Sequence, residues 1–302
     1  MDTLKNILLA TTIILTSLSC TEKEPEPKGT PEYIAEIEQW HQKRIERLKK
    51  DTGWLSLVGL YWLKEGENTF GSSEKNDIKF PANSPSKIGT IILKDSVLTF
   101  KSADGVNVLN NGVKVTELEL KDDLTGKHAT LASGSLRWYI IKRGDRYGIR
   151  LRDVESPILK EFKDINIYPI NEDWRIEATF KPYDPPKQIL IPNILGTTEV
   201  DKSPGALFFT KDGKSYKLDA IESRSGFFII FADETSGKET YGAGRFLYTD
   251  NPDSNNKVIL DFNIAYNPPC VFTKYATCPL PPKQNYLRLK ITAGEKMWGE
   301  LH

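Results

Sequence analysis

The feature that most constrains the fold is a long succession of short, strand-like segments between residues 66 and 262, separated by turn residues. Alternation is clearest at Trp174–Phe180, where every second residue is apolar, as in a half-buried strand. Pairs such as Asp104-Gly105 and Asp212-Gly213 are typical of tight turns between antiparallel strands. No helical period is visible between Ser156 and Leu301. The sequence therefore predicts a mainly β protein.

One helix is predicted, over residues 31–52. Thr30 can cap its first turn, and Pro31 suits the first helical position because its missing N–H would be unpaired there anyway. Residues that could form one buried face recur at spacings of three and four, namely Ile34, Ile37, His41, Ile45 and Leu48. We expect this face to pack on a β body. The basic C-terminal end, which includes Arg44 and Arg47, would be solvated or would meet a phosphate or lipid headgroup.

The strands divide into two predicted domains. Residues 53–155 are expected to form a small β-sandwich, and residues 156–302 a larger antiparallel β-barrel or sandwich. The stretch Val154–Asp164 is the expected linker between them. The first domain weakly resembles the forkhead-associated (FHA) β-sandwich, and the matching residues are Gly71, Asn76, Asp77, Ile78, Ser86, Asn111 and Gly112.

The FHA resemblance implies a sandwich fold without that family's recognition of phosphopeptides. FHA domains read phosphothreonine with an arginine directly after the glycine, and Ser72 occupies that position here. No histidine follows Ser86. Because a guanidinium is missing, the bidentate contact to phosphate cannot form.

The first twenty residues are predicted to be a targeting segment rather than part of the fold. Ile7–Leu18 is an apolar run too short to span a bilayer. The small residue before Cys20 resembles the end of a bacterial lipoprotein signal, which would make Cys20 the lipidated N-terminus. The alternatives are an ordinary secretory signal or a cytoplasmic N-terminus. Residues 21–30 are charged and proline-rich, so we expect a disordered tether. With a lipid on Cys20, the protein would be anchored in the bacterial cell envelope, at the periplasmic or outer-membrane surface.

Charge and histidine content argue against several functional classes. Lys+Arg and Asp+Glu are equal at 41 each, so there is no basic excess to bind nucleic acid. The three histidines, His41, His128 and His302, are scattered along the chain. A histidine-based metal site or a Ser-His-Asp triad is therefore poorly supplied. We expect no metal, no cofactor and no nucleic-acid partner.

Hydrogen-bonding and ionisable residues gather among glycines and prolines in the stretch Thr240–Lys296, which is the predicted site. Tyr241 offers a hydroxyl and Arg245 a planar fork of five donors. Gly242 and Gly244 would allow a close approach of the backbone. No βαβ unit surrounds these glycines, which excludes a dinucleotide-binding fingerprint.

Further polar residues of this stretch have two interpretations. Asp261 and Asn263 would project to the same side of a strand, where they could orient a substrate or act as base and oxyanion donor. Together with Asn267, they could equally form a buried network that fixes the proline-rich crossover. Glu295 and Lys296 could be a paired charge in the site or part of a surface turn.

Cys270 and Cys278 are predicted to form a local disulfide, as is natural in an oxidising compartment. Closing this loop would contribute roughly 2–3 kcal/mol in the loop-entropy description. Free thiols are the alternative. A zinc site would need two more ligands, and no histidine is near in sequence.

A charged hairpin is also predicted, and it carries Arg143, Arg146, Arg150 and Arg152. Arg150 and Arg152 share a strand face because they are two residues apart. The group is either an anion cradle or a charged edge that discourages pairing with another strand.

Several motifs together resemble one known family. They are Gly53-Trp54-Leu55, Thr240–Arg245, Asp261–Asn263, Tyr266–Cys270, Cys278–Pro282, Asn285 and Ala293–Lys296. This pattern, which covers roughly Trp40 to Lys296, is similar to the domain-of-unknown-function family 1684 (DUF1684). The resemblance implies a bacterial protein of uncharacterised role and brings no reaction with it.

The first functional hypothesis is a binding protein for a small polar or anionic ligand. Arg245 would pair with the anion, Asp261 would orient Arg245, and Tyr241, Asn263 and Asn267 would add hydrogen bonds. An aromatic wall that suits a sugar would come from Trp138, Trp174 or Tyr266. The expected partners are thus a small molecule and, through the lipid anchor, a membrane.

Two other hypotheses stay open. The protein could be a hydrolase or lyase that uses Asp261 or Glu295 as acid or base, with Tyr241 or Arg245 stabilising charge. It could also be a structural scaffold lipoprotein whose C-terminal motif only fixes a disulfide loop. The surroundings of Arg245 discriminate between these hypotheses, because a structural role would have its donors met from within the protein.

Overall fold

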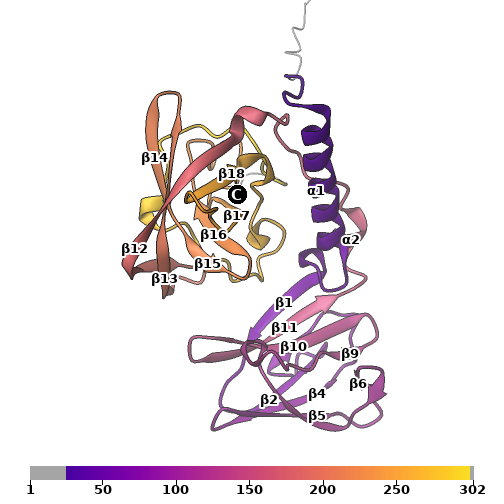
Figure 1. Ribbon diagram of the computed structural model, residues 1–302. Coiled ribbons are helices and arrows are strands. Elements are labelled where there is room, and N and C mark those ends of the chain that lie inside the picture. Colours follow the sequence, from indigo (N-terminus) through magenta and orange to yellow (C-terminus); the bar gives the residue numbers. More distant parts are fainter. Residues whose placement is uncertain (1–24, 300–302) are drawn as a thin grey trace, which may run out of the picture.

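A computed structural model describes residues 25–299 and shows a long helix beside two β domains (Figure 1). The mainly β fold with one N-terminal helix is confirmed. The predicted signal segment, Cys20 and the first part of the tether lie outside the described residues. Among the helices that are described, none is long and apolar enough to cross a bilayer.

Helix α1 (Pro31–Lys49) begins where the sequence predicts and ends three residues before the expected boundary at residue 52. The Tyr33 amide donates a hydrogen bond to Oγ1 of Thr30, 3.2 Å away, which caps the first turn. The buried face consists of Tyr33, Ile37, His41, Arg44 and Leu48. It is therefore rotated from the predicted apolar stripe, because Tyr33 and Arg44 find polar partners in the second β domain whereas Ile34 and Ile45 are only half-buried.

The first β domain is a sandwich of two sheets. One sheet has the order β1 (Leu57–Trp62), β11 (Arg146–Asp153), β10 (Leu136–Arg143), β9 (Leu131–Ser133), β6 (Leu109–Asn110) and β7 (Val113–Lys114). The other has the order β3 (Ile78–Lys79), β2 (Gly66–Gly71), β4 (Gly89–Lys94), β5 (Val97–Ser102) and β8 (Glu117–Leu120). Phe70, Phe80, Phe100 and Trp138 fill the space between the sheets, so Trp138 belongs to the core and not to a binding wall.

The second β domain also has two sheets around one core. The four-stranded sheet has the order β14 (Lys214–Asp219), β13 (Thr198–Lys211), β12 (Arg175–Pro192) and β18 (Lys257–Asp261). The three-stranded sheet has the order β15 (Ile221–Ser223), β16 (Gly226–Phe231) and β17 (Arg245–Asp250). Trp174, like Trp138, is a buried core residue.

Two local predictions need correction in this domain. The sequence predicts two separate strands, Trp174–Lys181 and Gln188–Pro192, whereas Arg175–Pro192 is one long strand, β12, whose pairing with β13 shifts register between Pro182 and Lys187. One short helix, α2 (Pro157–Glu161), follows Ser156, although no helical period was visible there. A single turn is too short to show a period, and it is held by the Ser156 cap.

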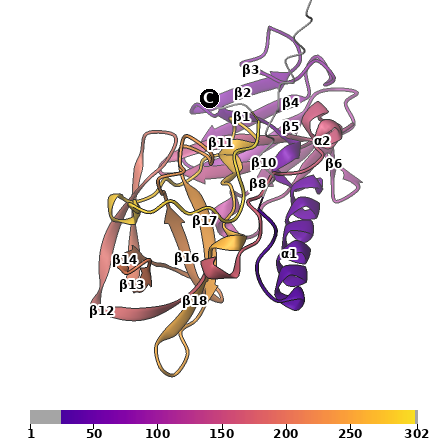
Figure 2. The ribbon, with the colours of Figure 1, turned by 90° about the horizontal axis from the view of Figure 1, so that it is seen from above.

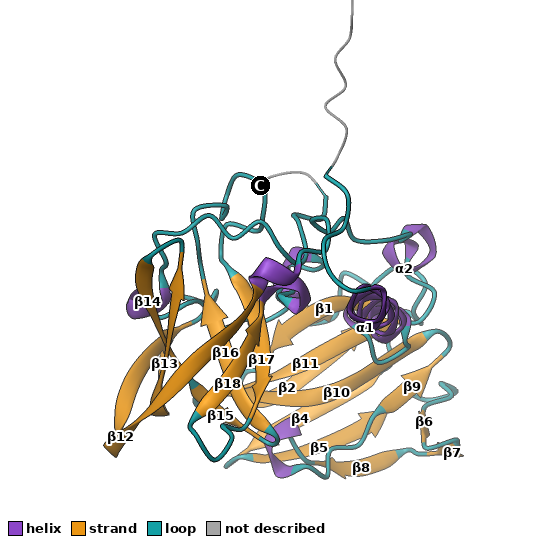
Figure 3. Ribbon diagram, turned by 45° about the horizontal axis from the view of Figure 1, so that its top comes forward, coloured by secondary structure: helices purple, strands orange, loops and turns teal. Residues whose placement is uncertain are grey.

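Helix α1 and the C-terminal segment after β18 connect the two domains. Figure 3 shows α1 nearly end-on, in the angle between the sheets of the two domains, and Figure 2 shows the same helix next to the short turn that follows β18. From the C-terminal segment, Oγ1 of Thr273 donates a hydrogen bond to the carbonyl of Leu57 in β1 (3.0 Å). The molecule is thus held together by long-range contacts that converge next to α1.

Candidate functional site

Arg245, the first residue of β17, lies in a filled interior. It is 1% exposed, and its Nη2 atom pairs with Oδ2 of Asp233 at 2.7 Å. The carbonyl groups of Ile291 (3.1 Å) and Ala293 also accept hydrogen bonds from its guanidinium. Arg245 therefore ties the β16–β17 hairpin to the C-terminal segment, which is the arrangement expected of a structural role.

Two glycines of the predicted site, Gly244 and Gly294, lie close against the protein's own backbone and not beside an open space. At Gly244, where φ is +85°, an added Cβ would lie 2.3 Å from the carbonyl oxygen of Phe231. At Gly294, where φ is +77°, it would lie 2.4 Å from the carbonyl oxygen of Ala265. Both positions require glycine because the backbone has a positive φ and no room for a side chain.

Asp261 and Asn263 do come together, as predicted, but not across a strand. Asp261 ends β18 and caps the following turn, where its Oδ1 accepts hydrogen bonds from the Asn263 amide and side chain, each 3.0 Å. The Tyr33 hydroxyl of α1 donates to the same carboxylate at 2.9–3.0 Å. Burial raises the pKa of Asp261, while these hydrogen bonds oppose the shift. The carboxylate thus anchors the start of α1.

Glu295 and Asn267 form a second contact with the helix. Glu295 is 0% exposed and accepts from Nε of Arg44 at 3.1 Å and from the Asn267 amide at 2.7 Å. Arg44 also donates to the Asn267 carbonyl at 2.9 Å. Burial raises the pKa of Glu295, and the Arg44 guanidinium opposes that shift. Lys296 stacks its ammonium on the Tyr168 ring, 5.0 Å from the centroid.

The predicted site residues therefore fall into separate networks rather than one pocket. Arg245 and Glu295 are neighbours, since the Glu295 carbonyl lies 3.4 Å from Nη1 of Arg245. Asp261 and Asn263 belong to the Tyr33 network at the other end of the helix. Tyr241 is half-buried, and burial raises the pKa of its hydroxyl. Among these residues Glu295 lines a cavity of about 420 Å³ together with His41 and Asp164, and Asp261 does not.

His41 faces that cavity from α1. Its Nε2 donates a hydrogen bond to the Asn263 carbonyl at 3.1 Å, because a carbonyl can only accept. Burial lowers the pKa of His41, so the neutral form with a bare Nδ1 is favoured. No group of three or more metal-binding side chains occurs within residues 25–299.

A different cavity, of about 470 Å³, has the composition of a binding site. It lies between α1 and the β16–β17 hairpin, and we call it the aromatic cavity. Six aromatic side chains line it, namely Trp40, Trp54, Phe228, Phe246, Tyr248 and Tyr266. Arg44 and Arg47 line it as well, and no carboxylate does. The sequence predicts a ligand contact for Tyr266 and, as one of two alternatives, for Arg44 and Arg47.

The charge around the aromatic cavity is positive. Arg44 lies over the Tyr266 ring at 4.6 Å and Arg47 near the Trp40 ring at 5.8 Å. Arg47 is exposed and makes no ion pair with any residue in the described part of the chain. Arg44 is the better-fixed of the two, because Glu295 and Asn267 hold it.

Two more arginines lie near the Trp54 ring. Arg150 and Arg152, both on β11, lie 5.6 and 5.8 Å from the Trp54 ring. Arg150 is 4% exposed, its Nε atom has no hydrogen-bond partner, and neither arginine has an ion pair within residues 25–299. Since Arg150 and Arg152 are buried, they are not the exposed charged edge considered from the sequence.

The two tyrosines of the aromatic cavity keep their hydroxyl protons. Burial raises the pKa of Tyr266, as does its neighbour Tyr248, and burial also raises the pKa of Tyr248. Their rings are near-parallel with centroids 6.4 Å apart. Both hydroxyls can therefore donate a hydrogen bond at neutral pH.

Sequence reasoning missed most of this cavity because its parts are distant along the chain. The sequence shows Arg44 and Arg47 only as part of a basic helix end, and nothing in it joins them to Trp40 and Trp54. The combination of six rings with two cations arises only where α1, docked against the segment after β18, faces β16 and β17 across the cavity.

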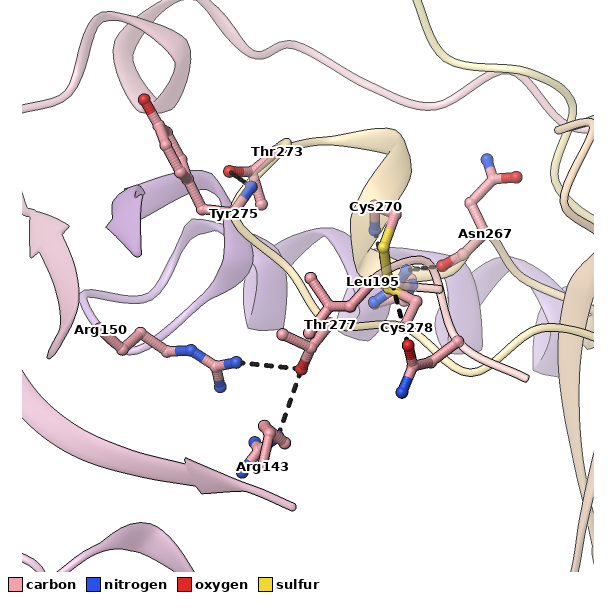
Figure 4. The surroundings of a disulfide bond; sticks show 11 residues. Arg143, Arg150, Leu195, Asn267, Cys270, Thr273, Tyr275, Thr277 and Cys278 are labelled. Carbon is pink, nitrogen blue, oxygen red and sulfur yellow. Dashed lines mark hydrogen bonds between the residues drawn. A yellow bond between two sulfur atoms is a disulfide. The ribbon is translucent and has the colours of Figure 1, made fainter. Parts of the chain in front are cut away.

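The predicted disulfide between Cys270 and Cys278 is present, with Cα atoms 6.2 Å apart. Its loop reaches the sandwich domain, as Figure 4 shows: Oγ1 of Thr277 accepts hydrogen bonds from Arg143 (3.3 Å) and Arg150 (3.4 Å). The disulfide loop is therefore part of the contact between the two domains.

Comparison with known proteins gives one family match, and it lies over the second domain. The sequence model of the family described as "Protein of unknown function (DUF1684)" matches residues 160–296. This part of the chain is similar to that family. The DUF1684 region runs from α2 to Lys296, so it contains Arg245, Tyr266, the disulfide and Glu295, and it leaves out α1 and the sandwich.

Solved structures with partial similarity were also found. An uncharacterised protein of Haloarcula marismortui is 28% identical over 47% of this chain and 80% of its own, with a TM-score of 0.39. An FHA domain described for phosphothreonine-dependent interactions, and the FhaA FHA domain, are each 16% identical over 31% of this chain, with TM-scores of 0.22; the matches cover 92% and 97% of those domains. No curated protein sequence matches the chain.

Proposed function

We propose that the protein binds a small organic anion in the aromatic cavity. One observation carries this proposal: Arg47, which has no ion-pair partner in residues 25–299, lines a cavity together with six aromatic rings, and no carboxylate lines that cavity. A cation in such surroundings attracts an anion, and the rings bury the apolar part of the ligand. The site adjoins the C-terminal motif through Tyr266 and Pro269.

The other groups of the cavity support an anion rather than a neutral ligand. Arg44 is fixed by Glu295, so it presents its guanidinium without losing much conformational freedom on binding. Arg150 and Arg152 add positive charge behind Trp54. The protonated hydroxyls of Tyr248 and Tyr266 can donate to a carboxylate, sulfonate or phosphate.

The positions of the carboxylates favour binding over catalysis. Asp261 accepts hydrogen bonds from Tyr33 and Asn263, and Glu295 is paired with Arg44. An acid–base pair for hydrolysis would need both groups beside one substrate. Here they serve two separate contacts of α1. The proposed setting remains the cell envelope, where a lipid at Cys20 would hold the binding domain close to a membrane.

The test uses anilinonaphthalene sulfonate, an aromatic anion, as the probe. Binding should change the fluorescence of Trp40 and Trp54, and Arg47→Ala should weaken the affinity about tenfold or more, since a hydrogen bond to a charged group contributes roughly 1.5–3 kcal/mol. Lys43→Ala is the matched control, because Lys43 is an exposed cation of α1 that does not line the cavity. Equal affinity in Arg47→Ala and Lys43→Ala would refute the proposal.

A further inference from the structure

A second cavity, of about 720 Å³, adjoins the aromatic cavity between the two β domains, and we call it the interdomain cavity. Lys142 and Arg143 of β10 line it from the sandwich side. From the DUF1684 side its apolar lining comes from Ile191, Val200, Ile221, Phe228, Ile230 and Pro279. Val200 is 61% exposed, so apolar surface continues to the rim of the cavity.

Phe228 of β16 lines both cavities. Its ring lies edge-on to Phe246 (5.0 Å) and stacks on Tyr248 (4.8 Å), which are both in the aromatic cavity. Its strand neighbour Ile230 lies in the interdomain cavity, and Ile230 and Phe246 belong to one hydrophobic cluster. The two cavities therefore share one apolar surface that passes over Phe228.

The charges of the two cavities differ. The charged residues that line the aromatic cavity, Arg44 and Arg47, are both cations. The interdomain cavity is lined by two cations and two carboxylates, namely Lys142, Arg143, Glu199 and Asp201. Arg143 is also paired with Asp123 at 2.9 Å. An anionic group is therefore favoured in the aromatic cavity, and an uncharged one is favoured along the apolar wall of the interdomain cavity.

The disulfide loop borders both cavities and fixes the passage between them. Pro269, directly before Cys270, lines the aromatic cavity, and Thr277 and Pro279, on either side of Cys278, line the interdomain cavity. Figure 4 shows Thr277 held by Arg143 and Arg150. The surface over Phe228 is thus bounded by a covalently closed loop rather than a free one.

We propose that the ligand is a single-chain amphiphile. Its anionic head group lies between Arg44 and Arg47, and its alkyl chain crosses Phe228 into the interdomain cavity. This inference rests on the proposed function, because it places the head group in the same site. It adds the second cavity and the class of ligand.

The test is a chain-length series of linear fatty-acid anions, from hexanoate to dodecanoate, below their micelle concentrations. Affinity is measured by displacement of anilinonaphthalene sulfonate. Each added methylene that enters an apolar cavity should tighten binding about fourfold, since its burial stabilises by about 0.8 kcal/mol. Affinity should rise in this way until the chain fills the cavity.

Two kinds of variant separate the head-group site from the chain site. Ile221→Lys and Val200→Lys place a charge in the interdomain cavity, so they should flatten the chain-length dependence and leave hexanoate binding unchanged. Val200 is largely exposed, so its variant should fold even if Ile221→Lys does not. Arg47→Ala should weaken all chain lengths by the same factor. Ile259→Lys, on β18 outside both cavities, is the matched control.

The outcomes are distinguishable. A chain-length dependence that disappears in Val200→Lys and persists in Ile259→Lys supports the inference. Arg47-dependent binding of the sulfonate with no chain-length dependence overturns the inference and leaves the proposed function standing. Absence of sulfonate binding overturns both.

Discussion

At the scale of single residues, Arg245 shows how a buried charge serves the fold. Its partner Asp233 is also 1% exposed at the side chain, so the pair lies out of water. Arg245→Met should lower the free energy of unfolding by about 3–5 kcal/mol, because it leaves the Asp233 carboxylate buried and uncompensated. Urea denaturation measures this loss. Arg288→Met, at an exposed arginine, is the control and should cost less than about 0.5 kcal/mol.

A loss below about 1 kcal/mol for Arg245→Met would contradict the structural role and make Arg245 a candidate ligand contact again.

The sequence singles out Arg245 as a candidate site residue but does not show that Asp233 is its partner. Asp233 comes two residues after β16, and only the pairing of Phe231 with Arg245 across the hairpin brings the two charges together. A polar residue among glycines suits a ligand site and a buried ion pair equally, so the pattern alone could not decide.

At the scale of elements, the disulfide closes a local loop that also contacts the sandwich domain. Cys270→Ser with Cys278→Ser should destabilise the protein by about 2–3 kcal/mol in the loop-entropy description, since the open loop has more freedom in the unfolded state. Thermal unfolding with and without dithiothreitol measures it. Reductant should lower the Tm of the wild-type protein and leave the double variant unchanged. An equal response of the two proteins would show that the loop is not closed by this bond in solution.

The elements that can be predicted are those whose determining residues lie close together in the sequence. The start of α1 follows from Thr30 and Pro31, which act within one turn, and the disulfide follows from two cysteines eight residues apart. The length of β12 could not be read from the sequence, because the stretch around Asp184 and Pro185 has the composition of a turn. Pairing with β13 on both sides of the irregularity keeps it in the sheet.

At the scale of the whole molecule, the aromatic cavity exists only because α1 is docked. Its lining comes from α1, from Trp54, from β16 and β17, and from the segment after β18. Sequence patterns describe each of these segments on its own, and they do not show that the segments come together in the folded protein. The family match has the same limit, since it covers residues 160–296 and therefore not Trp40, Arg44, Arg47 or Trp54.

The pair Arg44–Glu295 is the contact that should hold this arrangement, because it joins α1 to the C-terminal segment across 251 positions of the chain. Arg44→Met and Glu295→Gln should each cost about 3–5 kcal/mol, since each leaves a buried charge without its partner. The double variant should cost less than the sum of the two by more than about 1 kcal/mol, because it leaves neither charge behind. A double-mutant cycle by urea denaturation measures this coupling. The exposed pair Lys257–Glu177 is the control and should couple by less than about 1 kcal/mol. Additive losses at Arg44 and Glu295 would mean that helix docking, and with it the aromatic cavity, depends on the apolar contacts of α1 instead.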